Sequence, residues 1–180
     1  MSEELNKISD FYITSDTWFG RPQILEIAKR TQFATVEEMN DQLVKNWNKV
    51  VKSSDLVFHL GNFAWDPLTA RTILKKLKGK IFFIIGNADE ALLEVAEEFE
   101  NVVILDHQIV ELPQFDSVLC HYPLEVWNGK SSGTIHFHGH TVFSHKTDLR
   151  VSNRINTCVD FWSYSPIKFS AIKEFVNGKI

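Results

Sequence analysis

The sequence predicts a four-layer α/β/β/α sandwich, and three observations lead to this fold class. Apolar strands alternate with amphipathic helices in the first half of the chain, whereas the second half is richer in strands. Three polar, glycine-containing loops follow directly after strands, at the end where α/β folds build their sites. This order is typical of two packed sheets flanked by helices. No linker, repeat or low-complexity tract divides the 180 residues, so we expect one domain spanning residues 1–180.

In the first half of the chain, the residues that begin and end the expected strands and helices are easily recognised. A strand is expected at Phe11–Ser15, and a helix from about Val36, where Thr35 and Glu38 have the spacing of a capping box. The apolar residues of that helix share one face: Met39, Leu43, Trp47 and Val50. Asp66-Pro67 then predicts the start of a helix that ends at Gly79.

The remaining expected elements are mostly short apolar strands. Ile81–Ile85 is almost wholly apolar, as expected for a strand covered on both faces. The others are strands at 55–60, 102–105, 108–112, 117–120, 134–138 and 154–159, a helix at 90–99 and a final helix from about residue 166.

Composition describes an ordinary globular protein, with 44% hydrophobic and 23% charged residues. A formal net charge of -4 gives no signal for nucleic-acid binding. The polar, acidic N-terminus and the lack of a long apolar run indicate neither a signal peptide nor a membrane segment. Cys120 and Cys158 lie in expected strands without CxxC spacing, so we expect buried, reduced thiols and a cytoplasmic location.

Five short segments carry the chemistry of the sequence, and any one of them alone would be weak. They are 15-SDTWFG-20, 60-LGNF-63, 86-GNAD-89, 120-CHYP-123 and 138-HGHTV-142. Their order and spacing resemble the motif series DxH, GD, GNHD, H and GHxH of the calcineurin-like metallophosphoesterases, over nearly the whole chain. The segment 157–166 is also similar to the ending of the compact bacterial and phage members of that family.

The resemblance implies the metallophosphoesterase type of α/β/β/α sandwich and a hydrolase of phosphomonoesters or phosphodiesters. In that family the motifs hold two divalent metals, commonly manganese, iron, zinc or nickel. Two cations about 4 Å apart clamp phosphate oxygens and activate a water, and a carboxylate bridges the cations. Imidazoles and an amide oxygen complete the metal shells.

Four motif positions carry residues that differ from the family's ligands and acid–base groups: Trp18, Asn62, Ala88 and Val142. The first metal would therefore keep only Asp16, and we do not expect a dinuclear centre. The second would keep Asn87, His121 and His140, with Asn62 as a neutral substitute for the bridging carboxylate. The resemblance thus implies at most one divalent cation (Mn, Zn, Fe or Ni) and native hydrolysis that is lost or much reduced.

The residues that flank these positions match the family pattern: Ser15, Gly20, Gly61, Gly86, Asp89, Gly139 and Thr141. Drift after a loss of function should alter the loops together with the ligands. Replacement at four reactive positions instead suggests an engineered variant, or selection for a different use of the same pocket.

The replacements also suggest a different pocket, formed by Trp18, Asn62, Ala88 and Val142. Such a pocket could accept a flat organic molecule stacked on Trp18, although Trp18 could equally fill the vacated space as core packing. Asp16, near apolar side chains and without a cation, could have a raised pKa and act as a general base. His121 and His140 could serve as acid, base or hydrogen-bond donor near neutral pH.

Other polar residues are better explained by structure. We expect His59 and His136 to be satisfied histidines of the core, and His138 to order its loop. The pair Asp89-Glu90 is explained by a helix N-terminus.

Four hypotheses remain. The leading one is a phosphoesterase-fold protein with its two-metal chemistry disabled. The second is a metal-independent catalyst or binder for a small aromatic molecule that uses Asp16 and Trp18. The third is a non-catalytic binding protein, and the fourth is a weak one-metal phosphoesterase. In each the expected partner is a small molecule or phosphoester, and nothing in the sequence points to a membrane.

Overall fold

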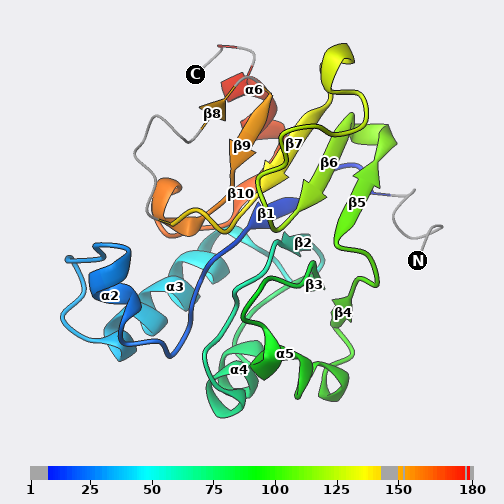
Figure 1. Cartoon of the computed structure of the whole chain (residues 1–180). Helices are drawn as coiled ribbons and strands as arrows, with labels where there is room; N and C mark the ends of the chain where they lie inside the picture. Colours follow the sequence, from blue (N-terminus) through cyan, green and yellow to red (C-terminus); the bar gives the residue numbers. More distant parts are fainter. Residues whose placement is uncertain (1–7, 143–149, 152, 177, 179–180) are drawn as a thin grey trace.

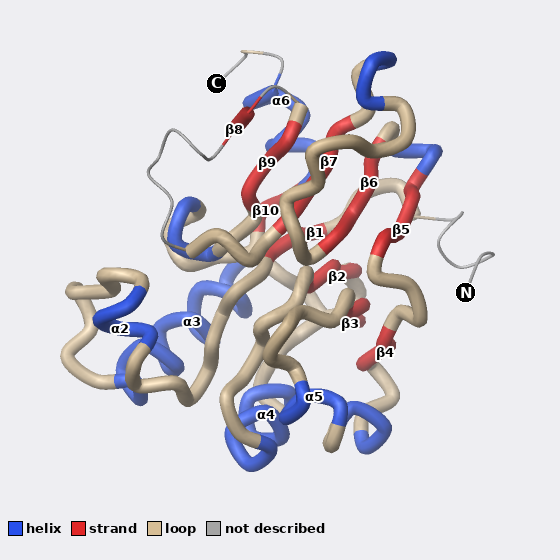
Figure 2. Tube along the Cα trace, in the orientation of Figure 1, coloured by secondary structure: helices blue, strands red, loops and turns tan. Residues whose placement is uncertain are grey.

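A computed structural model describes residues 8–142, 150–151, 153–176 and 178, and it has a mixed α/β architecture. The α/β class predicted from the sequence is confirmed. Two five-stranded sheets lie face to face, with helices α2 to α5 gathered on the far side of the first sheet (Figures 1 and 2). No helix in the described part of the chain is long and apolar enough to cross a membrane.

The first sheet has the order β10-β1-β2-β3-β4. Its strands are β1 Tyr12–Thr14, β2 Leu56–His59, β3 Lys80–Phe83, β4 Val102–Ile104 and β10 Ile167–Lys168. Strands β1 to β4 run parallel, and β10 is antiparallel to β1. The loops after β1, β2 and β3 therefore leave the same edge of the sheet.

The second sheet has the order β5-β6-β7-β9-β8. Its strands are β5 Ile109–Leu112, β6 Ser117–Cys120, β7 Ile135–His138, β8 Arg150–Val151 and β9 Arg154–Asn156. Strands β6, β7 and β9 are parallel, and β5 and β8 run antiparallel at the two edges.

Two hydrophobic clusters hold these layers together. The cluster between the sheets contains Phe11, Phe58 and Phe82 from the first sheet and Leu119 and Phe137 from the second. Alternate residues of β3 face opposite ways: Phe82 lies in this cluster, whereas Ile81 and Phe83 face the helices. The expectation that this strand is covered on both faces is confirmed.

The helices are α2 Ile24–Ile27, α3 Val36–Val50, α4 Pro67–Leu74, α5 Glu90–Leu93 and α6 Phe169–Val176. Helix α3 buries Met39, Leu43 and Trp47 against the first sheet, and Thr35 accepts a hydrogen bond from the Glu38 backbone N–H, as the capping pattern predicts. Helix α6 contributes Phe169 and Ile172 to the cluster between the sheets.

The outer face of the second sheet is covered differently from that of the first. His136 projects from it beside Trp127, with ring centroids 5.2 Å apart, and accepts a hydrogen bond from Leu124 N–H at 3.0 Å. The connection between β6 and β7 therefore covers this face, and its only described helix is the short 3-10 turn Lys130–Ser132.

Several boundaries differ from those expected. Helix α4 ends at Leu74 rather than Gly79, because the chain leaves the helix through a tight turn in which Lys76 N–H donates to the Ile73 carbonyl. The helix expected at 90–99 is broken after Leu93, and Val95 has the non-helical φ of -120°. The short elements α2, β8 and β10 were not expected, since two to four residues carry little periodic signal.

One buried cation, Arg30, connects the helices packed on the first sheet to the first motif loop, residues 15–20. The side chain of Arg30 is fully buried and forms a bidentate ion pair with Asp160, at 2.9 and 2.8 Å. The same guanidinium donates to the carbonyl oxygens of Asp16 and Thr17 at 2.8 and 2.9 Å. Arg30 thus fixes the backbone on which the first motif residue is mounted.

We expect Arg30→Met to lower the free energy of unfolding by about 3–5 kcal/mol, because it leaves Asp160 and two buried carbonyl groups without their partner. The control is Arg71→Met, which breaks the exposed pair with Glu98 and should leave the urea midpoint nearly unchanged. Equal shifts of the midpoint in the two variants would contradict the role of Arg30.

Candidate functional site

The five motif loops meet at one edge of the paired sheets. The loop after β1 runs beside the loop after β2: Asp16 N–H donates to the Gly61 carbonyl at 2.9 Å, and Trp18 N–H to the Asn62 carbonyl at 3.1 Å. On the second sheet, Gly139 N–H donates to the His121 carbonyl at 2.9 Å. The convergence predicted from the motifs is therefore present, although the motifs come from two different sheets.

The backbone at this edge is unusual. Among the described residues, eight non-glycine residues have a positive φ, and four of them lie in the motifs: Asp16, Trp18, Asn62 and His140. Aspartate, asparagine and histidine tolerate the left-handed region better than most residues, whereas for a bulky residue such as Trp18 it is a true outlier. Such strain gathers at functional sites, where surrounding contacts hold it in place.

Asp89 is one of those contacts. Its carboxylate is buried and accepts backbone hydrogen bonds from Asn62, Phe63 and Gly86, at 2.8, 2.7 and 2.7 Å. The sequence interpretation of Asp89 as part of a helix N-terminus is therefore incomplete, because its side chain makes no capping bond to α5. Instead it joins the second and third motif loops.

Asp16 joins the first motif loop to two others. Its carboxylate oxygens accept from the Asn62 amide at 2.9 Å and from His140 N–H at 2.8 Å. Burial raises the pKa of the Asp16 carboxyl group, while His121 and the hydrogen bonds from Asn62, Ser15 and His140 oppose this rise. The raised pKa agrees with the sequence expectation, but the fully buried carboxylate faces its loop partners rather than an open cavity.

The Asn62 side chain is oriented by Asp16. Its Nδ2 donates to the carboxylate and lies 3.3 Å from His121 Nε2, whereas its Oδ1 is buried and has no hydrogen-bond partner among the described residues. Asn62 therefore presents nitrogen, and not oxygen, to His121. The expectation that Asn62 assists as a metal ligand is not supported, because the carboxylate of Asp16 requires the amide donor.

Three polar atoms from the remaining motifs form a close triangle. Asn87 Oδ1 lies 3.0 Å from His121 Nε2 and 3.0 Å from His140 Nδ1, and the two histidine nitrogens are 3.2 Å apart. His121 is buried at the base of this triangle, whereas Asn87 and His140 are exposed above it. The three residues predicted to share a site are thus brought together.

The triangle contains a contact between lone pairs. His121 Nδ1 lies 2.6 Å from the Leu60 carbonyl, so it carries the proton, and Nε2 of the neutral ring is an acceptor. Asn87 Oδ1 is an acceptor as well. A proton on His140 Nδ1 can be shared between the two, but it leaves their lone pairs facing each other at 3.0 Å. A shared cation resolves the conflict, and so does an Asn87 amide turned to present Nδ2 to the two rings.

The donor set fits one divalent cation. Ligand atoms about 2.1 Å from an octahedral cation lie about 3.0 Å from one another when their directions are perpendicular. One amide oxygen and two imidazole nitrogens suit manganese, iron, nickel or zinc. No group of three or more His, Cys, Asp or Glu side chains with metal-binding geometry occurs in the described part of the chain, which is consistent because one ligand here is an amide.

A second cation does not fit. Trp18 and Val142 occupy two of its four ligand positions, and both are buried members of the hydrophobic cluster below the site. The remaining carboxylate, Asp16, already has hydrogen bonds on both oxygens. The absence of a dinuclear centre stays a prediction, and it rests on the chemistry of these side chains at the positions that the resemblance implies.

A cavity of about 190 Å³ lies beside the triangle. Asn62, Asn87, His140, Trp18 and Val142 line it together with Arg21, and Ile24 and Ile27 of α2 close its apolar side. Ala88, which was expected in this pocket, instead packs against the hydrophobic cluster.

Arg21 was not predicted as a site residue. Its guanidinium carbon lies 4.2 Å from the ring centroid of Trp18 and 4.7 Å from that of Trp65, which is half exposed. Trp18 is therefore neither simple core packing nor a free stacking wall, because a cation covers its ring. The only sequence signal was the cation directly after the first motif.

Three of the other described histidines have structural partners, although Nδ1 of His59 is buried without one among the described residues. His136 contacts the carbonyls of Val118 and Tyr122, and His138 Nδ1 lies 2.9 Å from the Gly139 carbonyl. His59 donates to Thr17 Oγ1 at 3.1 Å, since the Thr17 hydroxyl itself donates to the Phe63 carbonyl. Both cysteines are buried and free, as expected.

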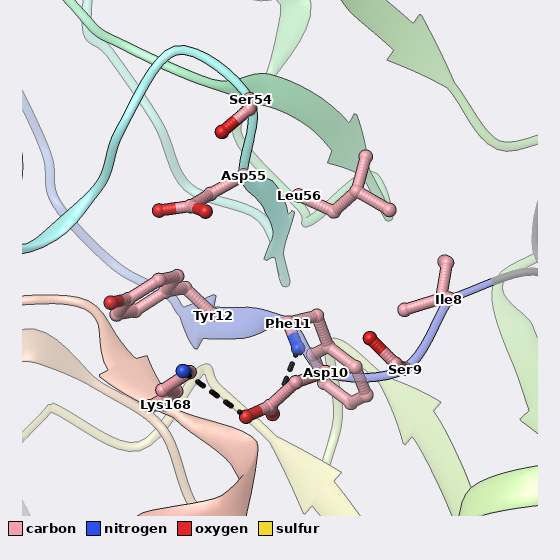
Figure 3. A pocket seen from close by; sticks show the side chains of 9 residues that line it. All are labelled: Ile8, Ser9, Asp10, Phe11, Tyr12, Ser54, Asp55, Leu56 and Lys168. Carbon is pink, nitrogen blue, oxygen red and sulfur yellow. Dashed lines mark hydrogen bonds and ion pairs between the residues drawn. The ribbon is translucent and has the colours of Figure 1, made fainter.

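A larger cavity, of about 310 Å³, opens at the opposite end of the first sheet (Figure 3). It lies between Asp10–Tyr12, Ser54–Leu56 and Lys168. Its cation is already neutralised, because Lys168 pairs with Asp10 at 3.4 Å, and Asp10 also accepts from Phe11 N–H. None of the motif residues reaches it, and we assign it no role.

Two known proteins are similar to this chain over nearly its whole length. The uncharacterized protein MJ1445 of Methanocaldococcus jannaschii is 32% identical over 177 residues, covering 94% of this chain and 93% of that protein. The chain belongs to the family of this archaeal protein. A crystal structure of AQ665 from Aquifex aeolicus, a protein of unknown function, matches with a TM-score of 0.68 and 25% identity, over 92% of this chain and 98% of that one. No protein-family model matches the sequence.

We expect Asp89→Asn to destabilise the protein by about 1–3 kcal/mol, because one oxygen that accepts backbone hydrogen bonds becomes a donor facing donors. The exposed neighbour Glu90→Gln removes the same charge and serves as the control. Chemical unfolding measures both, and hydrogen exchange at Asn62 and Phe63 should accelerate only in Asp89→Asn. Unchanged exchange there would contradict the bridging role.

Burial and, to a smaller extent, the nearby His121 lower the pKa of His59 to about 3. The unfolded chain takes up a proton at this residue below about pH 6.5, whereas the folded chain does not, so the stability is lost as pH falls from about 6.5 towards 3. The loss should approach about 1.4 kcal/mol per pH unit. We expect His59→Gln to remove this part of the pH dependence in urea titrations, and the exposed His107→Gln to retain it.

Proposed function

We propose that the protein is a phosphoester-binding member of the calcineurin-like metallophosphoesterases that retains one divalent cation site and has lost most of its two-metal hydrolysis. The observation that carries this proposal is the triangle of Asn87 Oδ1, His121 Nε2 and His140 Nδ1, with sides of 3.0–3.2 Å. Its spacing suits a shared cation, which would receive the lone pairs that face one another across the triangle.

The wider structure supports the family assignment. The five motif segments lie at one edge of two facing sheets, in the order that the resemblance implies. The finer fold description, a four-layer α/β/β/α sandwich of the metallophosphoesterase type, is part of this proposal. Helices cover the first sheet, whereas the fourth layer would consist mainly of the connection between β6 and β7.

One cation explains binding better than rapid hydrolysis. When bound, a divalent cation supplies a Lewis acid that polarises a phosphoryl oxygen. The chain's own residues hold the site open: His121 is fixed by its bond to the Leu60 carbonyl, and Asn87 and His140 remain accessible to a ligand. With Trp18 and Val142 at positions where the resemblance implies ligands of the other metal, the chain's residues would hold one cation and would lack the ligands to hold a second.

A metal-independent catalyst that uses Asp16 and Trp18 finds less support. Asp16 is fully buried and does not line the cavity, so it has no path to a substrate proton. The ring of Trp18 is covered by Arg21, which leaves little room for an aromatic substrate to stack.

We expect the protein to bind one equivalent of Mn²⁺ in calorimetric titrations. His121→Ala should weaken this binding by at least about tenfold, because it removes the ligand that anchors the triangle. His107→Ala, which removes an exposed histidine outside the motifs, should leave the affinity unchanged. Absence of saturable binding, or the same affinity in His121→Ala, would refute the cation site.

Restoring the missing ligands should restore hydrolysis. With Mn²⁺ and an aryl phosphodiester, we expect the variant Trp18→His/Asn62→Asp/Ala88→His/Val142→His to react at least about a hundredfold faster than the parent chain, since a second metal contributes several kcal/mol to the barrier. Adding His121→Ala to this variant should abolish the gain. Equal rates in the parent and restored chains would contradict the proposal that hydrolysis has been lost.

A further inference from the structure

Two buried donors at the 190 Å³ cavity have no partner in the described part of the chain. They are Nε of Arg21 and Nε1 of Trp18. A buried N–H without a partner is destabilising, so native structures rarely keep two of them in one place. Together they indicate a ligand that brings acceptors to this cavity.

The charge of the cavity points to the same kind of ligand. Its lining contains the guanidinium of Arg21 but no carboxylate among the described residues. No described aspartate or glutamate forms an ion pair with Arg21. The apolar side chains of Ile24, Ile27 and Val142 lower the local dielectric, which strengthens the attraction between this cation and an anion.

The position of Arg21 leaves its donors available. Its flat guanidinium group lies over two indole rings, at 4.2 Å from Trp18 and 4.7 Å from Trp65. Cation–π contacts hold the group in position through its faces. The N–H groups point outward in the plane of the guanidinium, where they suit two oxygens of one phosphate.

We propose that Arg21 and Trp18 form an anion subsite that binds the terminal phosphoryl group of a phosphomonoester, next to the cation triangle. Arg21 donates to the phosphoryl oxygens, and Trp18 Nε1–H supplies a further donor. The terminal phosphoryl group of a monoester has three unesterified oxygens and up to two negative charges, whereas a diester has two such oxygens and one charge, so the subsite selects monoesters.

This inference rests on the proposed function for its choice of phosphate chemistry, but anion binding by Arg21 needs no cation. The test therefore uses the full chain after removal of cations with a chelator. Inorganic phosphate, phenyl phosphate and diphenyl phosphate are titrated separately and followed by calorimetry. We expect saturable binding of the first two and at least about tenfold weaker binding of the diester, which lacks the second charge and the third unesterified oxygen.

The matched variants are Arg21→Gln and Arg71→Gln. Both remove one positive charge, but Arg71 is exposed on α4 and pairs with Glu98. We expect Arg21→Gln to weaken phosphate binding by at least about tenfold, as for loss of a charged hydrogen bond, and Arg71→Gln to leave it unchanged. Trp18→Phe keeps an aromatic ring beneath Arg21 but lacks the N–H, and it should weaken binding several-fold. Unfolding midpoints confirm that each variant is folded.

The results separate this inference from the proposed function. Equal weakening in both arginine variants, or the absence of saturable phosphate binding, overturns the subsite. Phosphate binding that needs Mn²⁺ and is unchanged in Arg21→Gln also overturns it, while the cation site stands. Phosphate binding that depends on Arg21 in a protein that binds no Mn²⁺ supports the subsite and refutes the cation site. Equal affinity for the diester overturns the selection of monoesters.

Discussion

The hydrogen bond between the Asn62 amide and the Asp16 carboxylate, 2.9 Å long, is the contact on which the site depends. Asp16 extends β1 of the first sheet, and its other oxygen binds His140 N–H after β7 of the second sheet. One buried carboxylate therefore closes the edge where the two sheets meet. Arg30 donates a hydrogen bond to the Asp16 carbonyl, and Asp89 accepts one from the Asn62 backbone N–H. These supports hold a motif backbone that includes a strained tryptophan.

This contact also explains why the loops can keep their shape with fewer cations. An aspartate at position 62 would place a second carboxylate against Asp16, and two such groups this close need a cation or a shared proton between them. Asparagine replaces that requirement with a hydrogen bond that the chain makes by itself. This hydrogen bond fixes the Asn62 amide: its Nδ2 is turned towards Asp16, and its Oδ1 is left without a partner among the described residues. The exchange of a charge for an amide thus alters the whole pocket, and not only one ligand.

The sequence predicted much of this arrangement, and the failures have physical causes. Strands such as Ser117–Cys120 and the start of α3 at Val36 follow from apolar runs and a capping box, which are local signals. The convergence of Asn87, His121 and His140 followed from motif order. Arg30, Arg21 and the bridging role of Asp89 were missed because their partners lie far away along the chain, at positions 160, 65 and 62. The orientation of the Asn62 side-chain amide could not be predicted from the sequence either, since it depends on which neighbouring atom accepts a hydrogen bond.

Cation and anion binding are compatible at this edge because one group of atoms consists of hydrogen-bond acceptors and the other of donors. The triangle presents lone pairs and lacks positive charge, whereas Arg21 and Trp18 present N–H groups and lack acceptors. A phosphoryl group has enough oxygens to contact a cation at the triangle and the donors of Arg21 and Trp18 together. The two sites adjoin, because Asn87 and His140 belong to the triangle and also line the cavity. In the two-metal arrangement both sides of the phosphoryl group would meet cations held by the protein. In the proposed site the guanidinium of Arg21 would take the place of one of those cations, and it would bind oxygen without activating a water. Such a site would retain the recognition of a phosphomonoester and lose the group that makes its hydrolysis fast.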